Sequence, residues 1–287
     1  MAVNNIPEAA LKKIRRLGKL LNALSVVSPS MAGRAAFKVF CTPRTLPVRD
    51  KDAEFLATAR HEHFRMEGLA LRSYHWDHAD PQAPRILFLH GWESNTARWH
   101  KYIREALSRG YAVDAFDAPA SGHSEGKLLN ALLYSRALRK YLSVNPMPYA
   151  IVGHSLGCAA AVFGLTLYPI ERPSKVVLLA SFADSSRVIY DFANLIGAKE
   201  TVVKAIFRHV EKRSGMSIDE FSVQQKVQLL QDVTGFVLHD AADEVAPVTE
   251  GRDIAASWPC QYLETQGLGH KMQDKQVVRA VLDFLKI

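Results

Sequence analysis

The sequence has few cysteines and no long apolar run. Its 287 residues include only three cysteines, Cys41, Cys158 and Cys260, which lie far apart and show no metal-binding spacing. An odd number of scattered cysteines argues against a disulfide framework and favours reduced thiols in a cytosolic protein. No stretch reaches the roughly 18 apolar residues that a membrane-spanning helix needs. We therefore expect a cytoplasmic protein without a transmembrane helix.

Acidic residues are nearly absent from the first 49 residues, which contain nine Lys/Arg and one acid, Glu8, for a net charge of +8. The whole chain carries +7, so residues 50–287 carry −1. The basic character belongs to an N-terminal extension, and we expect no nucleic-acid-binding surface on the body of the protein. A signal peptide is a weaker interpretation of this segment, because polar residues interrupt its apolar part.

Within this extension, apolar residues recur at helical spacing, at Leu11, Ile14, Leu17, Leu21 and Leu24. The basic residues stand between them, so residues 5–24 are predicted to form a basic amphipathic helix that begins with Asn5, Pro7 and Glu8. Its apolar face either docks on neighbouring protein or lies peripherally on an anionic membrane surface or a partner. The pattern leaves both alternatives open.

From residue 62 onward, short apolar segments alternate with helical ones. Residues 62–76 predict a hairpin with Glu67-Gly68 at its turn. Further strands are predicted at 85–89, 111–116, 149–152, 175–179, 235–238 and 261–264. Helices are predicted near 96–109, 127–143, 156–168, 248–257 and 274–286. This alternation predicts an α/β fold with a mostly parallel, twisted sheet and helices on both faces.

Residues 182–234 interrupt the alternation with about 50 residues of helical spacing, including a capping box from Ser217 to Glu220. Open parallel sheets bind ligands at their carboxyl edge, where this insertion begins. We interpret it as a cap or lid, with a fixed structural insertion as the alternative. The predicted domains are an extension (1–49), a core (50–181 and 235–287) and a cap (182–234).

The most informative segment is Gly153-His154-Ser155-Leu156-Gly157, which follows an apolar strand and precedes an Ala-rich helix. The two glycines permit a tight strand-to-helix turn, and such a turn strains the central residue and exposes its side chain. We predict that Ser155 is a catalytic nucleophile. The alternative is a serine that only caps the helix.

A serine nucleophile needs a base and an acid that orients the base. His270 follows the last predicted strand and is the candidate base. Asp243 follows the preceding strand and is the candidate acid, although Asp240 and Glu244 share its loop. The order Ser155, Asp243, His270 places all three beyond carboxyl ends of strands.

An oxyanion hole needs backbone N–H groups. The candidates are the N–H of Trp92, after the first parallel strand, and that of Leu156, after the nucleophile. Gly91 would let the backbone approach the substrate closely. A catalytic role for His90 is a weaker alternative. His90 precedes Ser155 in the chain, and it stands in a turn that is expected to contribute backbone N–H groups and not side chains.

These segments together resemble the α/β-hydrolase superfamily over about residues 62–287. The matching motifs are His90-Gly91-Trp92, Asp117-Ala-Pro-Ala-Ser-Gly-His-Ser124, the segment around Ser155, His239 through Pro247, and Gly269-His270. Ala120 and Asp240 stand where the family usually has glycine. The resemblance implies a serine hydrolase of the esterase or lipase type, with Ser155, Asp243 and His270 as its triad.

We therefore expect a serine hydrolase that cleaves a small-molecule carboxylic (acyl) ester through an acyl-enzyme, without a cofactor. The same triad could cleave a thioester, an amide or a carbon–carbon bond, because pocket and cap decide the substrate. A noncatalytic ligand-binding or membrane-associated protein on this scaffold is an alternative of another class. No metal is expected, because no acidic or cysteine ligands accompany the histidines at His61, His63, His75 and His78. The oligomeric state is not indicated by the sequence.

Overall fold

The structure is a computed structural model that describes residues 8–44 and 47–286. Contacts divide the chain into two compact units. Pro43–Phe182 with Val223–Ile287 form the sheet unit, and Met1–Thr42 with Ala183–Ser222 form the helical unit.

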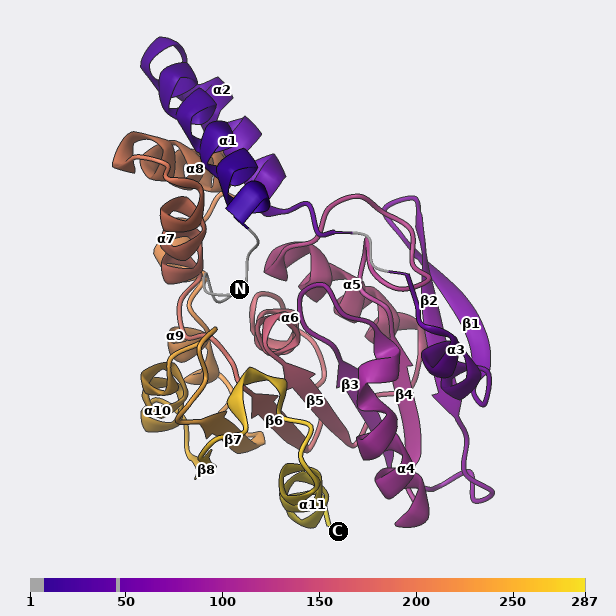
Figure 1. The fold of residues 1–287 in the computed structure, drawn as a ribbon. Helices are drawn as coiled ribbons and strands as arrows, with labels where there is room; N and C mark the ends of the chain where they lie inside the picture. Colours follow the sequence, from indigo (N-terminus) through magenta and orange to yellow (C-terminus); the bar gives the residue numbers. More distant parts are fainter. Residues whose placement is uncertain (1–7, 45–46, 287) are drawn as a thin grey trace. The chain divides into compact units, whose positions relative to one another are not determined.

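The sheet unit contains one eight-stranded sheet in the order β1-β2-β4-β3-β5-β6-β7-β8 (Figure 1). Its strands are β1 (Arg60–Met66), β2 (Leu69–Trp76), β3 (Arg85–Leu89), β4 (Ala112–Phe116), β5 (Ala150–His154), β6 (Lys175–Leu179), β7 (Thr234–Asp240) and β8 (Cys260–Thr265). β2 pairs antiparallel with β1 and β4, and all other neighbours pair parallel. The predicted mostly parallel α/β sheet is confirmed, and its parallel strands are largely buried apolar runs.

The predicted hairpin is confirmed at β1 and β2. Glu67 has φ 52° and Gly68 has φ 83°, so both turn residues are left-handed, as a two-residue turn of type I′ requires. The hairpin adds an antiparallel edge to the parallel strands.

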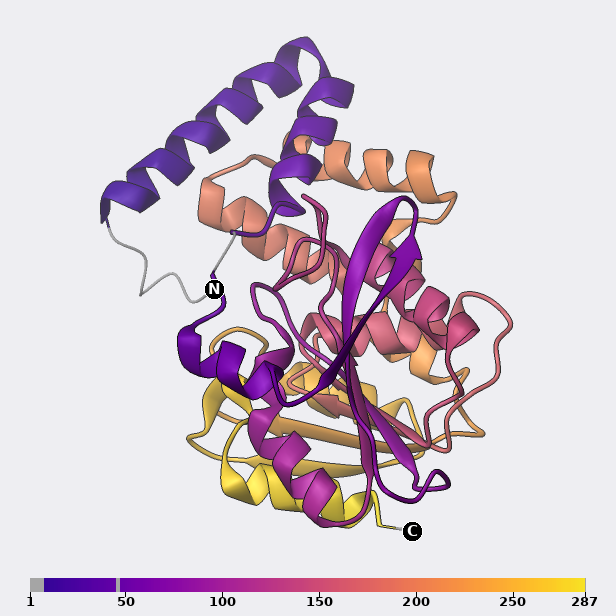
Figure 2. The same cartoon turned by 90° about the vertical axis from the view of Figure 1, so that its right-hand side faces the viewer.

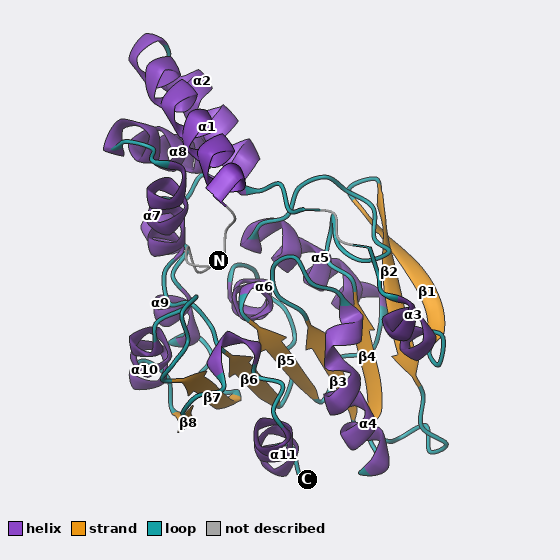
Figure 3. Ribbon diagram, in the orientation of Figure 1, coloured by secondary structure: helices purple, strands orange, loops and turns teal. Residues whose placement is uncertain are grey.

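Helices cover both faces of the sheet (Figure 3). The helices of this unit are α3 (Asp50–Leu56), η2 (Thr96–Trp99), α4 (His100–Ser108), α5 (Ala131–Val144), α6 (Leu156–Thr166), α9 (Val223–Val227), α10 (Val248–Ala256), η4 (Gly269–Lys271) and α11 (Lys275–Phe284). Alternate strand residues face opposite sides. Ile86 and Phe88 belong to a cluster with Trp99 of η2, Tyr102 of α4 and Val281 of α11, which marks the face that these helices cover. This packing holds the carboxyl ends of the strands in fixed positions.

The helical unit consists of α1 (Glu8–Val27), α2 (Pro29–Phe40), α7 (Ser185–Ile196), α8 (Glu200–Ser214) and η3 (Ile218–Glu220). The predicted amphipathic helix is present as α1, but two of its predicted start residues, Asn5 and Pro7, lie outside the described range. The apolar stripe of α1 faces α2, α7 and α8, and Leu21 in its centre is 4% exposed. The stripe is therefore used for packing within this unit.

Helices α2 and α3 were not predicted from the sequence. The buried face of α2 consists of Ala32, Gly33 and Ala36, which are too small to give a clear apolar period. A Cβ on Gly33 would lie 2.2 Å from the carbonyl oxygen of Ala205, so α2 approaches α8 at backbone distance. The predicted capping box is confirmed at the start of η3, where the Ser217 N–H donates to Glu220 Oε2 at 2.7 Å. No described helix is both long and apolar enough to cross a bilayer.

Candidate active site

Ser155 occupies the turn between β5 and α6 and has φ 52° and ψ −118°, a strained conformation for a residue with a side chain. Close packing fixes this turn. A Cβ on Gly157 would lie 2.2 Å from the carbonyl oxygen of Leu89, and one on Gly153 would lie 2.8 Å from the N–H nitrogen of Cys158. The strand–turn–helix prediction is confirmed. Among the described residues, the Ser155 side chain makes no capping hydrogen bond, which removes the helix-cap interpretation.

Asp243 and His270 come together at the ends of neighbouring strands β7 and β8. His270 Nδ1 lies 2.8 Å from Asp243 Oδ2, and the Asp243 side chain is fully buried. Asp243 Oδ1 accepts hydrogen bonds from the N–H groups of Val245 and Ala246 at 2.8 and 2.9 Å. The carboxylate is therefore fixed in orientation, with one oxygen directed at the histidine. Of the three acids that share the loop, the structure pairs Asp243 with His270.

Hydrogen bonds control the ionisation of Asp243. Burial by itself raises its pKa, but hydrogen bonds from His239, His270 and the Ala246 N–H outweigh burial and hold the pKa well below its usual range. Asp243 is therefore charged at neutral pH. A permanently ionised partner on Nδ1 favours the tautomer in which Nε2 of His270 is free to accept a proton.

His239 packs against the Asp243 carboxylate, a contact that the sequence did not reveal. Its Nε2 lies 2.8 Å from the Ala246 carbonyl oxygen and 3.3 Å from Asp243 Oδ2, and its ring is fully buried. Gly251 lets α10 pass closely, because a Cβ there would lie 2.5 Å from His239 Nδ1. The ring fills the space behind the carboxylate.

Asp240 links the loop that contains Asp243 to the loop that contains His270. Its Oδ1 accepts from the N–H groups of Ala242 and Gly269, both at 2.9 Å. Its Oδ2 accepts from Thr265 Oγ1 at 2.7 Å and from the N–H of Leu268 at 3.0 Å. Burial raises the pKa of Asp240, but these hydrogen bonds together leave it lower than usual. The residue that departs from the family pattern thus orders the segment that leads directly to His270.

His154 connects the nucleophile turn to the same segment. Its Nε2 lies 2.7 Å from the carbonyl oxygen of His270, and the two rings are 4.9 Å apart. Burial holds the pKa of His154 well below its usual value, so the ring is neutral and Nε2–H donates. Because His154 directly precedes Ser155, this hydrogen bond holds the Ser155 turn close to His270. The described structure contains no hydrogen bond between the Ser155 hydroxyl and His270, a contact that often tightens only when substrate binds.

The turn after β3 lies directly against Ser155. A Cβ on Gly91 would lie 3.2 Å from Ser155 Cβ, so only glycine allows this approach without displacement. His90 is fully buried; its Nδ1 lies 2.8 Å from the Gly91 carbonyl oxygen, and its Nε2 accepts from the Ala118 N–H at 2.9 Å. Both ring nitrogens therefore hold backbone, and His90 supports the turn that contains Trp92 instead of acting on a substrate.

Asp117 fixes the adjacent loop. Its Oδ1 accepts from the Thr96 N–H at 2.8 Å, and its Oδ2 accepts from the His123 N–H at 2.9 Å and from the Tyr74 hydroxyl at 3.0 Å. Ala120 in this loop has φ 57°, a left-handed conformation that explains why glycine is usual there. The loop thus holds a left-handed residue at this position although alanine stands there.

His61 and His75, two of the four histidines between His61 and His78, each contact a protein group through a ring nitrogen. His75 Nδ1 lies 2.9 Å from Asp114 Oδ1, and His61 Nε2 lies 2.7 Å from the Leu56 carbonyl oxygen. Within the described part of the chain, no three His, Cys, Asp or Glu side chains gather as metal ligands.

Comparison with known proteins places the chain in a family. The model of the alpha/beta hydrolase family matches residues 86–274. A pimeloyl-[acyl-carrier protein] methyl ester esterase from Vibrio vulnificus is 32% identical over 107 residues, which are 37% of this chain and 40% of that protein. The chain thus aligns with less than half the length of this curated relative.

Solved structures share the fold at low identity. An esterase from Rhodococcus sp. has a TM-score of 0.57 at 15% identity and covers 79% of this chain and 98% of its own. Alpha/beta hydrolase domain-containing protein 10 from mouse has a TM-score of 0.59 at 18% identity and covers 79% of this chain and 97% of its own. The family match includes Ser155, Asp243 and His270, and the chain belongs to the alpha/beta hydrolase family.

Proposed function

We propose that this protein is a serine hydrolase that cleaves a carboxylic ester through an acyl-enzyme. The observation that carries the proposal is the strained Ser155 turn beside the Asp243–His270 pair. Asp243 Oδ2 lies 2.8 Å from His270 Nδ1. A nucleophile on a sharp strand-to-helix turn and a base oriented by a buried carboxylate are the elements that acyl transfer needs.

In the first half of the reaction, His270 Nε2 takes the hydroxyl proton as Ser155 Oγ attacks the ester carbonyl. The N–H groups of Trp92 and Leu156 stabilise the oxyanion of the tetrahedral intermediate. The C–O bond to the alcohol then breaks, and His270 returns the proton to the leaving alcohol. Asp243 holds the imidazole in the correct tautomer throughout.

In the second half, water attacks the acyl-enzyme. His270 accepts one proton of this water and returns it to Ser155 Oγ, which releases a carboxylic acid. No step needs a cofactor, because every proton moves between the substrate, water and these side chains.

Activity-based labelling tests this proposal. The full-length protein should react with a fluorophosphonate probe at one serine and release p-nitrophenol from acyl esters, and Ser155→Ala should lose both. Ser121→Ala, a buried serine in the neighbouring Asp117–Ser124 loop, is the matched control and should keep labelling. Equal labelling of wild type and Ser155→Ala would contradict the proposal. Ligand-induced thermal stabilisation without turnover would instead support a noncatalytic binding protein.

The relative from Vibrio vulnificus suggests which ester to try first. Its name describes a methyl ester of an acyl group on a carrier protein. We propose a methyl ester of a medium-length acyl chain as the first natural-type substrate. A series of methyl esters of increasing acyl length, compared with the matching thioesters and amides, separates ester hydrolysis from the other bonds that such a triad can cleave.

The role of residues 182–234 as a mobile lid is also a proposal. If the segment gates access, a bulky ester should show a much larger rise in kcat/KM than a small one when mild detergent is added. An equal response of both esters would favour a fixed insertion.

A further inference from the structure

A short turn joins α1 to α2 (Figure 2). Exposed apolar residues flank this turn in the sequence. Among the described residues, the four most exposed large hydrophobic side chains are Val26 and Val27, each 85% exposed, Leu20 at 69% and Met31 at 57%. All four lie within 12 residues that flank one short turn. Such clustering of aliphatic side chains in water marks an interaction surface.

The two faces of α1 have different uses. The inner face, centred on Leu21, packs against the other helices of the same unit, and a Cβ on Gly18 there would lie only 1.9 Å from the Ile196 carbonyl oxygen. The outer face carries Lys13 and Arg16 in its first half and Leu20 and Val27 in its second, all exposed and all at helical spacing. The outer face therefore changes from cationic to apolar as it approaches the turn.

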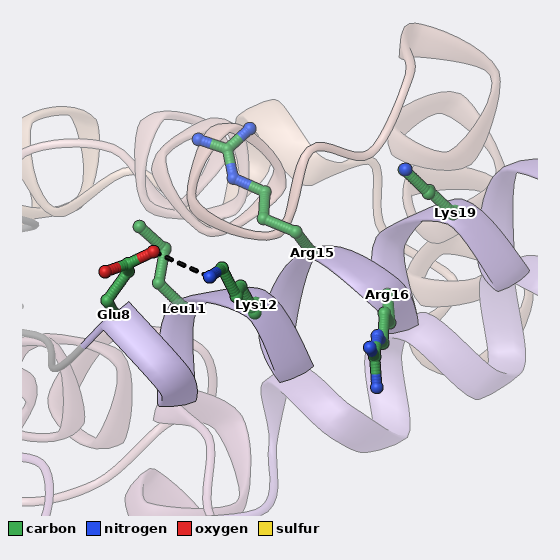
Figure 4. Close-up of a pocket in the computed structure, with 6 residues that line it drawn as sticks. All are labelled: Glu8, Leu11, Lys12, Arg15, Arg16 and Lys19. Carbon is green, nitrogen blue, oxygen red and sulfur yellow. Dashed lines mark ion pairs between the residues drawn. The ribbon is translucent and has the colours of Figure 1, made fainter.

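The charge of the helical unit is concentrated on the same two helices. Residues 8–42 contain seven basic residues and a single acid, whereas residues 183–222 contain six of each. The one acid, Glu8, forms an exposed salt bridge with Lys12 at 2.7 Å. Figure 4 shows Arg15 and Arg16 leaving α1 on opposite sides of the ribbon, with Lys19 about one turn further along. The α1–α2 hairpin thus presents a nearly uncompensated positive surface next to its apolar turn.

We propose that the α1–α2 hairpin docks on an anionic lipid surface. Val26, Val27 and Met31 enter the interface, while the basic side chains of α1 lie among the anionic head groups. Aliphatic residues combined with a polybasic face are the composition of interfacial helices. Protein-binding hot spots depend more on Trp and Tyr, and α1 and α2 contain neither.

This placement differs from a helix that lies on its main apolar stripe. The stripe from Leu11 to Leu24 is turned inward in the folded unit, so a membrane can meet only the outer face and the turn. Docking therefore requires no unfolding of the helical unit.

Vesicle flotation of the full-length protein tests the proposal. Wild type should float with phosphatidylcholine vesicles that contain about 30% phosphatidylserine and stay unbound with pure phosphatidylcholine, because the surface potential attracts the basic face. The double variant Val26→Ser/Val27→Ser should reduce the bound fraction about tenfold, since each side chain loses its apolar contact. The triple variant Lys13→Gln/Arg16→Gln/Lys19→Gln should cause a similar reduction.

Matched controls change the same chemistry on the sheet unit. Val144→Ser/Leu229→Ser removes two side chains that are each 52% exposed, and Arg65→Gln/Lys127→Gln/Arg279→Gln removes three exposed charges. Both controls should float like wild type, and all variants should keep wild-type circular dichroism and hydrolysis of a water-soluble ester.

Three outcomes would overturn the proposal. The first is absent flotation, or flotation that is equal in all variants. The second is retention on polyglutamate beads without flotation, which indicates an acidic polypeptide partner. The third is concentration-dependent self-association that Val26→Ser/Val27→Ser abolishes without any vesicle binding, which indicates a second copy of this chain.

Discussion

At the scale of single residues, Asp240 shows how a departure from a family pattern can be compensated. Glycine at this position would leave the N–H groups of Ala242, Leu268 and Gly269 without their carboxylate partner. With aspartate, one side chain satisfies all three and also bonds Thr265. Because Gly269 precedes His270, the position of His270, the proposed base, depends on this carboxylate.

Asp240→Asn should therefore weaken both fold and activity. The amide would turn an NH₂ group toward backbone N–H donors, at a cost of about 1–3 kcal/mol in the free energy of unfolding. The displaced His270 should lower kcat for ester hydrolysis by about tenfold or more. Urea unfolding and steady-state kinetics measure the two effects. Asp253→Asn, an exposed carboxylate on α10, should change neither, and a wild-type kcat in Asp240→Asn would refute the positioning role.

Asp243 gives a pH-dependent prediction. Its folded-state pKa lies below the unfolded value of about 3.9. The unfolded chain therefore takes up the proton first as pH falls. Asp243 stabilises the fold fully above the unfolded pKa, and this contribution is lost as pH drops through the folded pKa.

Asp243→Asn should accordingly lower the free energy of unfolding at pH 7, by an amount on the order of 1–3 kcal/mol. The difference in the free energy of unfolding between wild type and Asp243→Asn should narrow steadily below about pH 4. Urea unfolding at pH 7, 4 and 3 measures it, with Asp219→Asn as an exposed control. A gap that stays constant down to pH 3 would contradict the depressed pKa.

The sequence predicted Ser155, Asp243 and His270 because each stands at a fixed place in a local motif. It did not reveal the roles of His154, His239 or Asp240. The partner of His154 lies 116 residues away, and Asp240 bonds Thr265, Leu268 and Gly269 of the next strand and its loop, so only the folded sheet brings these groups together. His239 bonds Ala246 seven residues further along, a contact that depends on the folded shape of the loop. The pairing of Ser155 with His270 stays a prediction.

At the scale of elements, the close approach of α6 to β3 fixes the conformation of the turn that contains Ser155. Gly157→Ala would place a Cβ 2.2 Å from the Leu89 carbonyl oxygen. Gly164→Ala on the same helix would place one 2.9 Å from the flexible Leu138 side chain and 3.4 Å from the nearest backbone atom, the Ser135 carbonyl oxygen. Backbone cannot move aside as a side-chain methyl can.

Gly157→Ala should therefore cost about 2–3 kcal/mol in the free energy of unfolding and abolish probe labelling of Ser155. Gly164→Ala should be nearly neutral, because the gain in helix propensity of about 1 kcal/mol offsets the shift of Leu138. Thermal unfolding and fluorophosphonate labelling compare the two variants. Equal effects would show that the turn tolerates displacement.

Most strands could be predicted because parallel strands buried on both faces are continuous apolar runs. The same rule fails for α2, since its buried stripe consists of alanine and glycine. A stripe of small residues can be recognised as a buried helix face only when the backbone that packs against it is known, and here that backbone is α8. That partner is far away in the sequence.

At the scale of the whole molecule, the helical unit joins two separate parts of the chain. Phe37 of α2 contacts His209 of α8 at a ring distance of 5.4 Å, and Phe40 contacts Phe192 of α7 at 5.3 Å. Neither segment carries a pattern that identifies the other, because periodicity reports only local geometry.

Deletion of residues 1–42 should therefore do more than remove a basic extension. Val202, Ala205 and Ile206 of α8 are at most 2% exposed, and the deletion removes α2, which packs against that helix. The truncated protein should bind the dye ANS and elute partly as aggregates in size-exclusion chromatography. The full-length triple glutamine variant, which loses charge without losing contacts, is the control. A monodisperse truncated protein without dye binding would contradict this prediction.

The divided helical unit also has a consequence for synthesis on the ribosome. About 160 residues separate the end of α2 from the start of α8, and at about 5–20 residues per second the wait is roughly 10 to 30 s. During that time the small-residue face of α2 lacks α8, and the inner stripe of α1 has α2 beside it but lacks α7 and α8. The nascent hairpin therefore exposes apolar surface to other chains until α7 and α8 have been synthesised.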